Sequence, residues 1–580
     1  MVDRCPSDVG ARDIDPIPSE PASTLTRHRR FNTTPEVRLS LRAGFCLSAP
    51  LVVGLIVNQR SYAIVFAIGA LWAISQDGLD EWRVRGRRLF WVAVAATVGV
   101  AMGATFVGHD SSAAALVVFL GVAALIAGFV EASNWASQGA YLLIGSIIGA
   151  GLRFSGRVWQ SCLCVALGSL WVYAVAALTD RRNRLANQRV FLSNAFEVLA
   201  SLVEALDTPR FYTVRARAVT TLDAAQDVVG SRRRGRDGTE EVALRQCLIV
   251  ALRCGEVVSY LEGKHLRADA SVASALREVA GALRTTTGLN AVALLRDLPA
   301  RFNDIIGLDP TITSALVLSD PRDLPATPPR SSAPALARAT LPIVERLRFA
   351  AILSLAIVAG TLVANALDGL HGFWLPLSIA FILRPDLGPV ITRALARTVG
   401  TVVGVGIAAL VALSGNSIGL LIALSCVMAA TVPWATRRSH VLAVITFTPI
   451  VFVFLSLLGT EKYLFAPRII DTAIGAAIVL ILDVALWTTA PSLRPAQQLE
   501  KARAASARYE REATIDDPLR RHLLRRAALR AVTNARSALD QAQKEPRLLQ
   551  RLDPTTLQQL DEVESAIDTH TVSLLEQHST

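Results

Sequence analysis

The hydrophobic pattern of this 580-residue chain has two clusters of long apolar segments, each followed by a polar region. A helix needs roughly 20 apolar residues to cross about 30 Å of hydrocarbon, and most of the segments approach that length. We therefore predict twelve membrane spans, at 40–58, 61–76, 89–107, 113–130, 137–153 and 157–178 in the first cluster and at 348–366, 372–384, 397–413, 417–433, 439–458 and 467–489 in the second.

The polar regions have a helical period of their own. After the first cluster, apolar residues recur at helical spacing, as at Phe191, Ala195, Leu199 and Leu202. The final region is predicted to pack its helices against the middle region, or to form a loosely ordered helical tail. The chain thus divides into a cytoplasmic N-terminal tail (1–37), a first transmembrane bundle (38–179), a cytoplasmic helical domain (180–318), a proline-rich linker (319–345), a second transmembrane bundle (346–490) and a cytoplasmic helical tail (491–580).

The two halves of the chain repeat each other. Matching landmarks recur 306 to 309 residues later: Arg42–Gly54 as Arg348–Gly360, Asp77 as Asp386, and Arg88 as Arg397. A parallel duplication of this kind usually places a path through the bilayer at the interface of the copies. The expected fold is an all-α integral membrane protein with two parallel six-helix transmembrane repeats, each followed by a cytoplasmic helical region.

Composition argues against an ordinary soluble protein, because 52% of the residues are hydrophobic and only 18% are charged. The net charge of +11 would suit a nucleic-acid partner, but the arginines stand beside the apolar segments. That distribution is the positive-inside pattern, so the expected partner is the lipid bilayer and not nucleic acid. It also places both termini in the cytoplasm, and we expect no cleaved signal peptide.

The most specific motifs lie in the second half. The run from Gly372 to Gly388 begins Gly-Phe-Trp-Leu-Pro and ends Arg-Pro-Asp-Leu-Gly, and Arg397-Thr-Val-Gly400-Thr-Val-Val-Gly404 follows it. These motifs resemble the fusaric acid resistance protein-like superfamily, of the aromatic acid exporter type. A more distant similarity is to the plant aluminium-activated malate transporters. The resemblance implies efflux of small aromatic carboxylic acids across a bacterial plasma (inner) membrane.

A cationic cluster is expected where this short span ends. Pro385 disfavours helical conformation at Arg384, and Arg384, Asp386 and Arg393 would then form a partly neutralised group that attracts a carboxylate. Arginines at a membrane edge also bind lipid phosphate and fix topology, and that alternative stays open. The predicted anion path is completed by Trp374, Arg397, Arg85 and Arg88.

Few acids lie inside the predicted spans, where a charge costs at least roughly 2.5 to 3.5 kcal/mol. Asp471 follows Arg468 by one helical turn, which predicts a structural ion pair. Asp483 has no basic residue within a turn, so it either faces a polar cavity or is protonated, and it is the predicted proton-coupling residue. Close helix packing is expected at glycines four residues apart, Gly99 and Gly103 in the first half and Gly400 and Gly404 in the second.

The sequence contains no Gly-Lys-Ser or Gly-Lys-Thr phosphate loop and no His/Cys/acid cluster with metal-ligand spacing. We therefore expect neither an enzyme nor a bound cofactor or metal. The leading hypothesis is a secondary efflux transporter that exports small organic anions by proton antiport. A passive anion channel and a membrane scaffold with helical partner-binding domains are the alternatives. A second copy of the chain and a periplasmic adaptor stay open as partners.

Overall fold

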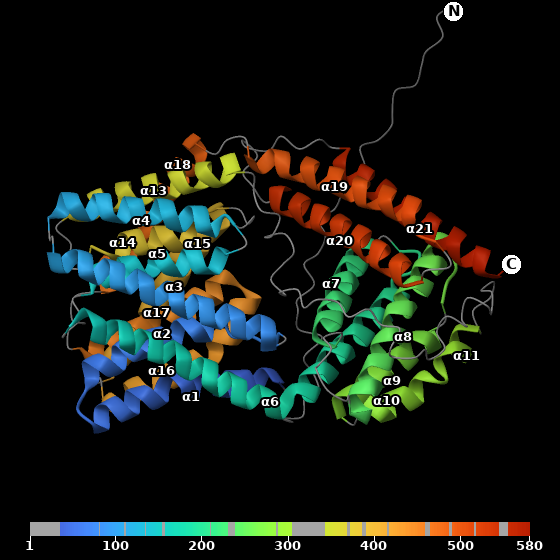
Figure 1. Cartoon of the computed structure of the whole chain (residues 1–580), viewed down its shortest axis with the longest axis horizontal. Coiled ribbons are helices and arrows are strands. Elements are labelled where there is room, and N and C mark those ends of the chain that lie inside the picture. Colours follow the sequence, from blue (N-terminus) through green and yellow to red (C-terminus); the bar gives the residue numbers. More distant parts are fainter. Residues whose placement is uncertain are drawn as a thin grey trace, which may run out of the picture.

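The computed structural model describes residues 35–579 except for 81, 110–111, 134, 153–156, 209, 230–237, 269, 286–287, 304–342, 368–371, 386–389, 415–416, 459–464, 487–489, 515–517 and 544–554. Every regular element in these described ranges is a helix, so the all-α prediction is confirmed. The helices form two bodies side by side, one of apolar helices and one of polar helices (Figure 1). We call them the membrane bundle and the helical domain.

The membrane bundle has a helix at each of the twelve predicted spans. Within the described ranges, nine helices are long and apolar enough to cross a membrane, and α2, α5 and α14 are shorter. The helices are α1 (Pro35–Ile56), α2 (Arg60–Gln76), α3 (Trp82–His109), α4 (Ala113–Glu131), α5 (Ala136–Gly151), α6 (Val158–Glu204), α13 (Ile343–Ala366), α14 (Trp374–Ile382), α15 (Val390–Leu413), α16 (Ile418–Arg438), α17 (His440–Leu457) and α18 (Phe465–Leu486).

A single long helix, α6, connects the two bodies. Its 47 residues correspond to about 70 Å of helix at 1.5 Å per residue. Its first part, Val158–Asp180, is apolar enough to span a membrane, and its second part belongs to the helical domain (Figure 1). The predicted boundary between bundle and domain therefore falls inside a continuous helix. We call the end of the bundle from which α6 emerges the domain side.

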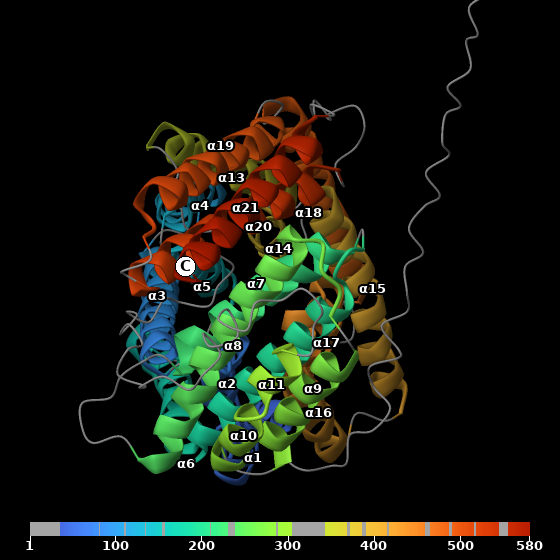
Figure 2. The ribbon, with the colours of Figure 1, turned by 90° about the vertical axis from the view of Figure 1, so that its right-hand side faces the viewer.

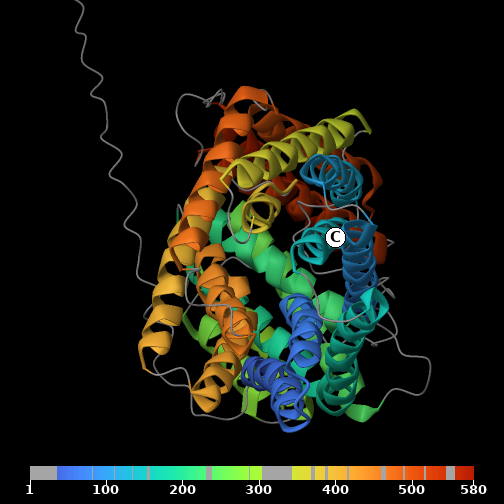
Figure 3. The same cartoon turned by 90° about the vertical axis from the view of Figure 1, so that its left-hand side faces the viewer.

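Helix contacts among the first six helices recur among the second six. The third helix of the first half, α3, packs against α5 and α6, and the corresponding α15 packs against α17 and α18. Between the halves, α4 packs on α13 and α16 packs on α1, at opposite edges of the bundle (Figure 3). Each half thus uses its fourth helix to cover the first helix of the other half.

The predicted packing glycines lie at close helix contacts. A Cβ atom added at Gly103 would be 2.6 Å from the backbone nitrogen of Ala150 on α5, and one added at Gly99 would also meet the α5 backbone. In the second half, a Cβ atom at Gly400 or Gly404 would be 2.7 Å from a side-chain atom of α17. The tighter pair is in the first half, where backbone meets backbone.

The helical domain combines the middle region of the chain with the C-terminal tail (Figure 2). Arg215 and Asp568 form a buried bidentate ion pair between the two regions, with both nitrogen–oxygen distances at 2.6 Å. Arg525 also donates to the carbonyl oxygen of Gly255 at 2.9 Å. The tail therefore packs against the middle region. Its helices are α7 (Phe211–Val229), α8 (Thr239–Gly263), α9 (Ala270–Thr285), α10 (Gly288–Leu295), α11 (Leu298–Asn303), α19 (Ala490–Glu512), α20 (Pro518–Gln543) and α21 (Thr556–Ser579).

A buried acid between α8 and α20 should make the domain sensitive to acid. Burial alone would raise the pKa of Glu256, but the contact with His522 and the charge of Arg525 hold that pKa at about 2, below the ordinary 4.5. A lowered pKa stabilises the fold above pH 4.5, and the benefit is lost as the pH falls towards 2.

We expect Glu256→Gln to lower the thermal midpoint of the full-length protein at pH 7 and to flatten its decline between pH 4.5 and 2. Thermal unfolding in detergent over this pH series measures both effects. Glu500→Gln, at a carboxylate 70% exposed on α19, is the matched control and should change neither. A normal acid profile in Glu256→Gln would show that this carboxylate does not stabilise the interface.

Candidate anion site

The short helix α14 carries the candidate site. It ends at Ile382, because Pro385 disfavours helical conformation at the residue before it. Trp374, Ser378 and Phe381 follow one another at spacings of four and three residues, so they share one face of the helix. α15 and α18 pack against α14. One face of an inner helix thus offers an aromatic ring, a hydroxyl group and a second aromatic ring in sequence.

Arg468 of α18 lies over the first of these rings. Its guanidinium carbon is 4.0 Å from the centroid of the Trp374 ring, and the residue is only 4% exposed. Its Nε and Nη1 atoms are buried without a hydrogen-bond partner. Within the described part of the chain, Arg468 and Asp471 form no ion pair, so the structure does not show the predicted pair. The arginine turns to a ring on another helix instead of to the acid one turn away.

Arg397 of α15 repeats the arrangement at the second ring. Its guanidinium carbon is 4.5 Å from the centroid of the Phe381 ring, and the residue is 6% exposed. Its Nε atom is buried without a hydrogen-bond partner, and so is the hydroxyl group of Thr401, one turn further along α15. None of the described carboxylates lies within ion-pair distance of Arg397 or Arg468.

The two arginines define two positions along α14. Trp374 and Phe381 are seven residues apart, which is about 10 Å along a helix. The Ser378 hydroxyl lies one turn from Trp374, donates to the Trp374 carbonyl oxygen at 2.9 Å and is 3.4 Å from the hydroxyl oxygen of Thr472 on α18. A guanidinium group can bind a carboxylate through two parallel hydrogen bonds. The arrangement can therefore hold a small anion at either position, with hydroxyl groups between them.

Further aromatic rings continue from Trp374. It stacks with Phe373 and with Phe452 of α17, at centroid distances of 5.3 and 6.4 Å. Phe452 stacks in turn with Phe465 at 4.9 Å. Stacked rings offer flat apolar faces, which suit an anion that carries an aromatic ring of its own.

The arginines predicted at the mouth of the path lie at the domain side. Arg393 donates from Nη2 to the Arg384 carbonyl oxygen at 3.2 Å, so the two are neighbours as expected. Asp386 lies outside the described residues. The carboxylate found beside Arg384 is that of Glu131, which is 2% exposed, with 3.7 Å between Nη1 and Oε1. Glu131 ends α4 of the first half, so this contact joins the two halves.

A corresponding contact lies at the other edge of the bundle, where α16 takes the place of α4. There the fourth helix carries the arginine and the other half carries the acids. Arg437 stands 306 residues after Glu131 and occupies the same place at the end of α16. It lies beside Gly78, near enough to Asp77 and Asp80 to feel their charges. The fourth helix therefore presents an acid to an arginine in one contact and an arginine to acids in the other.

Three arginines of the first half form ion pairs with acids of the same half. Arg85 and Arg88, which the sequence placed on the anion path, form ion pairs with acids of the first half. Arg85 is fully buried. The pairs are Arg42–Asp77 at 2.5 Å, Arg85–Asp180 at 3.0 Å and Arg88–Asp80 at 2.8 Å. Within the described part of the membrane bundle, Arg397 and Arg468 are buried arginines of the second half with no carboxylate within ion-pair distance.

The proposed proton-coupling residue, Asp483, lies close to the end of α18. Asp483 is in the last turn of α18, which ends at Leu486, and it is partly buried. The predicted span runs to 489, and residues 487–489 lie outside the described residues. Its role in coupling stays a prediction.

Sequence reasoning placed Trp374 and Arg397 on the anion path but assigned Arg468 to an ion pair, and it missed Phe381 and Glu131. The spacing of seven residues between Trp374 and Phe381 was a usable signal, because it places both rings on one helix face. The sequence signal for Glu131 was weaker: it is an acidic residue at the end of an apolar segment. Neither signal shows which helix supplies the arginine that contacts the residue.

Residues 355–482 match the model of a family described as fusaric acid resistance protein-like. This segment includes α14 to α17 and most of α18, and with them both buried arginines and their aromatic partners. The resemblance drawn from the sequence motifs is therefore confirmed. None of the matches is to a plant aluminium-activated malate transporter.

The curated relatives include two bacterial membrane proteins. The uncharacterized membrane protein YvaC of Bacillus subtilis is 22% identical over 474 residues, covering 77% of this chain and 72% of that protein. The inner membrane protein YccS of Escherichia coli is 29% identical over 164 residues, covering 28% and 23%. The uncharacterized protein ORF2 of Neisseria gonorrhoeae is 33% identical over 143 residues, covering 24% and 34%. No solved structure matches this chain at a significant level.

Proposed function

Because this chain carries a fusaric acid resistance protein-like domain at residues 355–482, we propose that it is a secondary transporter that exports small organic anions, aromatic carboxylates above all, in exchange for protons. One observation supports the proposal most directly. Arg397 and Arg468 are buried and stacked on aromatic rings, and neither has a carboxylate within ion-pair distance among the described residues. A buried charge without a counterion is costly, so a site that keeps two of them suits a counterion that arrives as substrate.

The proposed path runs along α14 from the domain side. An anion entering there first meets Arg384 and Arg393, then Arg397 over Phe381, and then Arg468 over Trp374. The hydroxyl groups of Ser378 and Thr472 can accompany it, and the rings of α14 and α17 can stack on an aromatic substrate. The direction is outward if the domain side faces the cytoplasm.

The proposed orientation rests on the arginines. Arg85, Arg88, Arg384, Arg393 and Arg437 all lie at the domain side of the bundle, which the positive-inside rule assigns to the cytoplasm. Both termini and the helical domain are then cytoplasmic, in the plasma membrane of a bacterium. The recurring contacts within each half support the further proposal of two parallel six-helix repeats.

Transport into inverted membrane vesicles tests the function. With an acidic interior, a proton antiporter should accumulate benzoate against its gradient, and collapse of the pH gradient should stop accumulation. Passive leakage works against this result, because neutral benzoic acid crosses membranes and collects on the alkaline side, outside. Vesicles without the protein are the control. Benzoate flux that ignores the pH gradient would favour the passive channel, and no added flux would leave the scaffold alternative.

The same assay tests Asp483, since asparagine keeps the size of the side chain but cannot ionise. If Asp483 carries the proton, we expect Asp483→Asn to bind benzoate normally and to lose at least about 90% of the gradient-driven accumulation. Benzoate binding to the purified protein is the matched measurement. Accumulation at the normal rate would exclude Asp483 as the coupling residue without affecting the assignment of the anion site.

A further inference from the structure

One helix pair of the first half contacts α14 at both of its ends. This pair consists of α4 and α5, which follow each other in the chain and pack together. Glu131, at the end of α4, meets Arg384 just after α14 ends at the domain side. Gly151, the last residue of α5, meets Phe373 at the start of α14. We call the end of the bundle opposite the domain side the outer end. The inner contact is thus ionic and the outer contact aromatic.

The outer contact places an aromatic ring on a glycine. A Cβ atom added at Gly151 would be 2.5 Å from Cδ1 of Phe373, so any side chain at Gly151 would displace this ring. Phe373 is partly exposed, whereas Trp374, on which it stacks, is only 3% exposed. Among the described residues, the Phe373 ring therefore lies between the outer end and the buried guanidinium group of Arg468 over Trp374.

The inner contact places an acid of the protein where a substrate carboxylate would arrive. Arg384 is one of the first two arginines on the proposed path, and its side chain is 24% exposed, so an anion can reach it. The distance of 3.7 Å between its Nη1 atom and Oε1 of Glu131 suits an ion pair but is longer than a hydrogen bond. A carboxylate that forms charge-assisted hydrogen bonds with Arg384 would compete with Glu131. The arriving anion can therefore weaken the contact at this end of α14.

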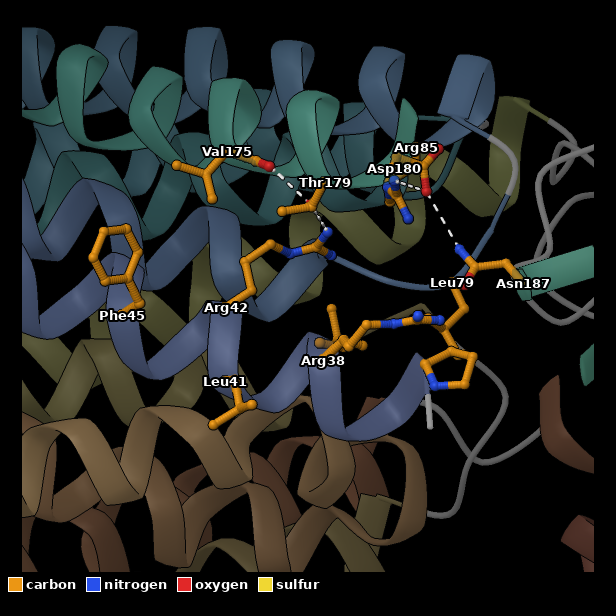
Figure 4. A pocket seen from close by; sticks show the side chains of 12 residues that line it. Arg38, Leu41, Arg42, Phe45, Leu79, Arg85, Val175, Thr179, Asp180 and Asn187 are labelled. Atoms are coloured by element: carbon orange, nitrogen blue, oxygen red, sulfur yellow. Dashed lines mark hydrogen bonds and ion pairs between the residues drawn. The ribbon is translucent and has the colours of Figure 1, made fainter. Parts of the chain in front are cut away.

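The rest of the first half is a firm frame for the α4–α5 pair. At the domain side, Arg42 of α1 donates to the Thr179 hydroxyl of α6 at 2.8 Å (Figure 4). Arg85 of α3 pairs with Asp180 of α6 at 3.0 Å (Figure 4). α5 in turn packs on α3, backbone against backbone, at Gly103. Because separating these helices would break ion pairs and close packing together, we expect α14 to be the element that moves.

We propose that these two contacts are the gates of the anion path and that the structure is its closed state. Phe373 on Gly151 closes the outer end, and Glu131 at Arg384 closes the inner end. The buried arginines are then reached from one side at a time, as in alternating access at the interface of two repeats. The path itself belongs to the proposed function, on which the two gates rest, but its closure can be measured without transport.

Chemical modification from each side of the membrane tests the outer gate. Ser378→Cys places a thiol on α14 between the gates, at a position that is 0% exposed. Its reaction with the impermeant anion methanethiosulfonate ethylsulfonate is read by mass spectrometry in right-side-out and in inverted vesicles. Phe373→Ala and Gly151→Ala should each raise the rate about tenfold from the outer end only, as for the loss of one aromatic contact. Phe119→Ala, which removes a stacked ring near the outer end of α4, is the control and should change neither rate.

The same assay tests the inner gate. Glu131→Gln should raise the rate about tenfold from the domain side only, because the amide keeps the size of the side chain but does not attract Arg384 as a carboxylate does. Glu345→Gln removes an exposed acid at the start of α13, on the same side, and should leave the rate unchanged. Rates are compared for equal amounts of folded protein.

Three results would contradict the gates. An unchanged rate in Phe373→Ala or in Gly151→Ala would overturn the outer gate, and an unchanged rate in Glu131→Gln would overturn the inner one. Rapid reaction of Ser378→Cys from either side with both gates intact would show that the structure is not a closed state. All these rates are measured without benzoate, so they decide the gates independently of the transport assay.

Discussion

Replacing Arg468 with glutamine should lower benzoate transport about 100-fold and leave the amount of folded protein unchanged. The guanidinium group can give a carboxylate two charge-assisted hydrogen bonds, each worth about 1.5 to 3 kcal/mol. A loss of about 3 kcal/mol corresponds to about 100-fold in affinity. Folding should not suffer, because the substitution removes a buried charge that has no carboxylate within ion-pair distance among the described residues and two of whose nitrogen atoms have no hydrogen-bond partner. The thermal midpoint should therefore be no lower than in the unmodified protein.

The chain offers a matched control at Arg438. This arginine also lies over an indole ring, 5.9 Å from the centroid of Trp434, but it is exposed at the end of α16. Arg438→Gln should transport benzoate normally. Vesicle assays normalised to folded protein compare the two variants. Normal transport by Arg468→Gln, or a clear loss of its thermal stability, would show that Arg468 serves the fold and not the substrate.

Gly103→Leu should abolish the folded membrane bundle. Any side chain at this position meets the α5 backbone, because even a Cβ atom would be 2.6 Å from the Ala150 nitrogen and would clash with the Ser146 carbonyl oxygen. Backbone atoms of a helix cannot avoid the clash by changing rotamer, as a side chain can, so α3 and α5 must separate. Overpacking typically costs 1 to 3 kcal/mol and occasionally more, and here a whole helix pair has to shift.

Gly406→Leu is the comparison, since nothing lies within 4 Å of a Cβ atom at Gly406. Size-exclusion chromatography of detergent-solubilised protein measures the folded fraction. We expect a monodisperse peak for Gly406→Leu and loss of that peak for Gly103→Leu. A normal peak for Gly103→Leu would mean that α3 and α5 are packed less closely than the structure has them.

The positions of the helices could be predicted because length and hydropathy are local properties. Each of the twelve apolar segments contains a helix. The end of the short helix α14 could be predicted from Pro385, which disfavours helical conformation at the residue before it. The partners of the polar side chains could not be predicted in the same way. Arg468 has an acid one turn away in sequence, yet its guanidinium group stacks on Trp374, 94 residues earlier. This contact depends on how α14 and α18 pack against each other, which the hydropathy of neighbouring residues does not show.

At the candidate site, too, the sequence identified the arginines but not the acid that contacts them. The motifs pointed to Arg384, Asp386 and Arg393, and the structure brings Arg384 and Arg393 together. The carboxylate at this cluster comes from Glu131 in the other half, because the fourth helix of each half covers the first helix of its neighbour. Contacts between the two halves depend on how the helices pack in three dimensions, and the sequence pattern does not show which side chains meet there.

Glu131 and Arg437 occupy corresponding positions in the two halves but carry opposite charges, so the two halves are not interchangeable. If two copies of the first half paired in this geometry, Glu131 of each would face Asp77 and Asp80 of the other. If two copies of the second half paired, Arg437 of each would face the other's Arg384. Both pairings set like charges against each other, whereas the joining of unlike halves sets opposite charges together. In this geometry, either half paired with a second copy of itself would lose the electrostatic attraction that joins the two unlike halves.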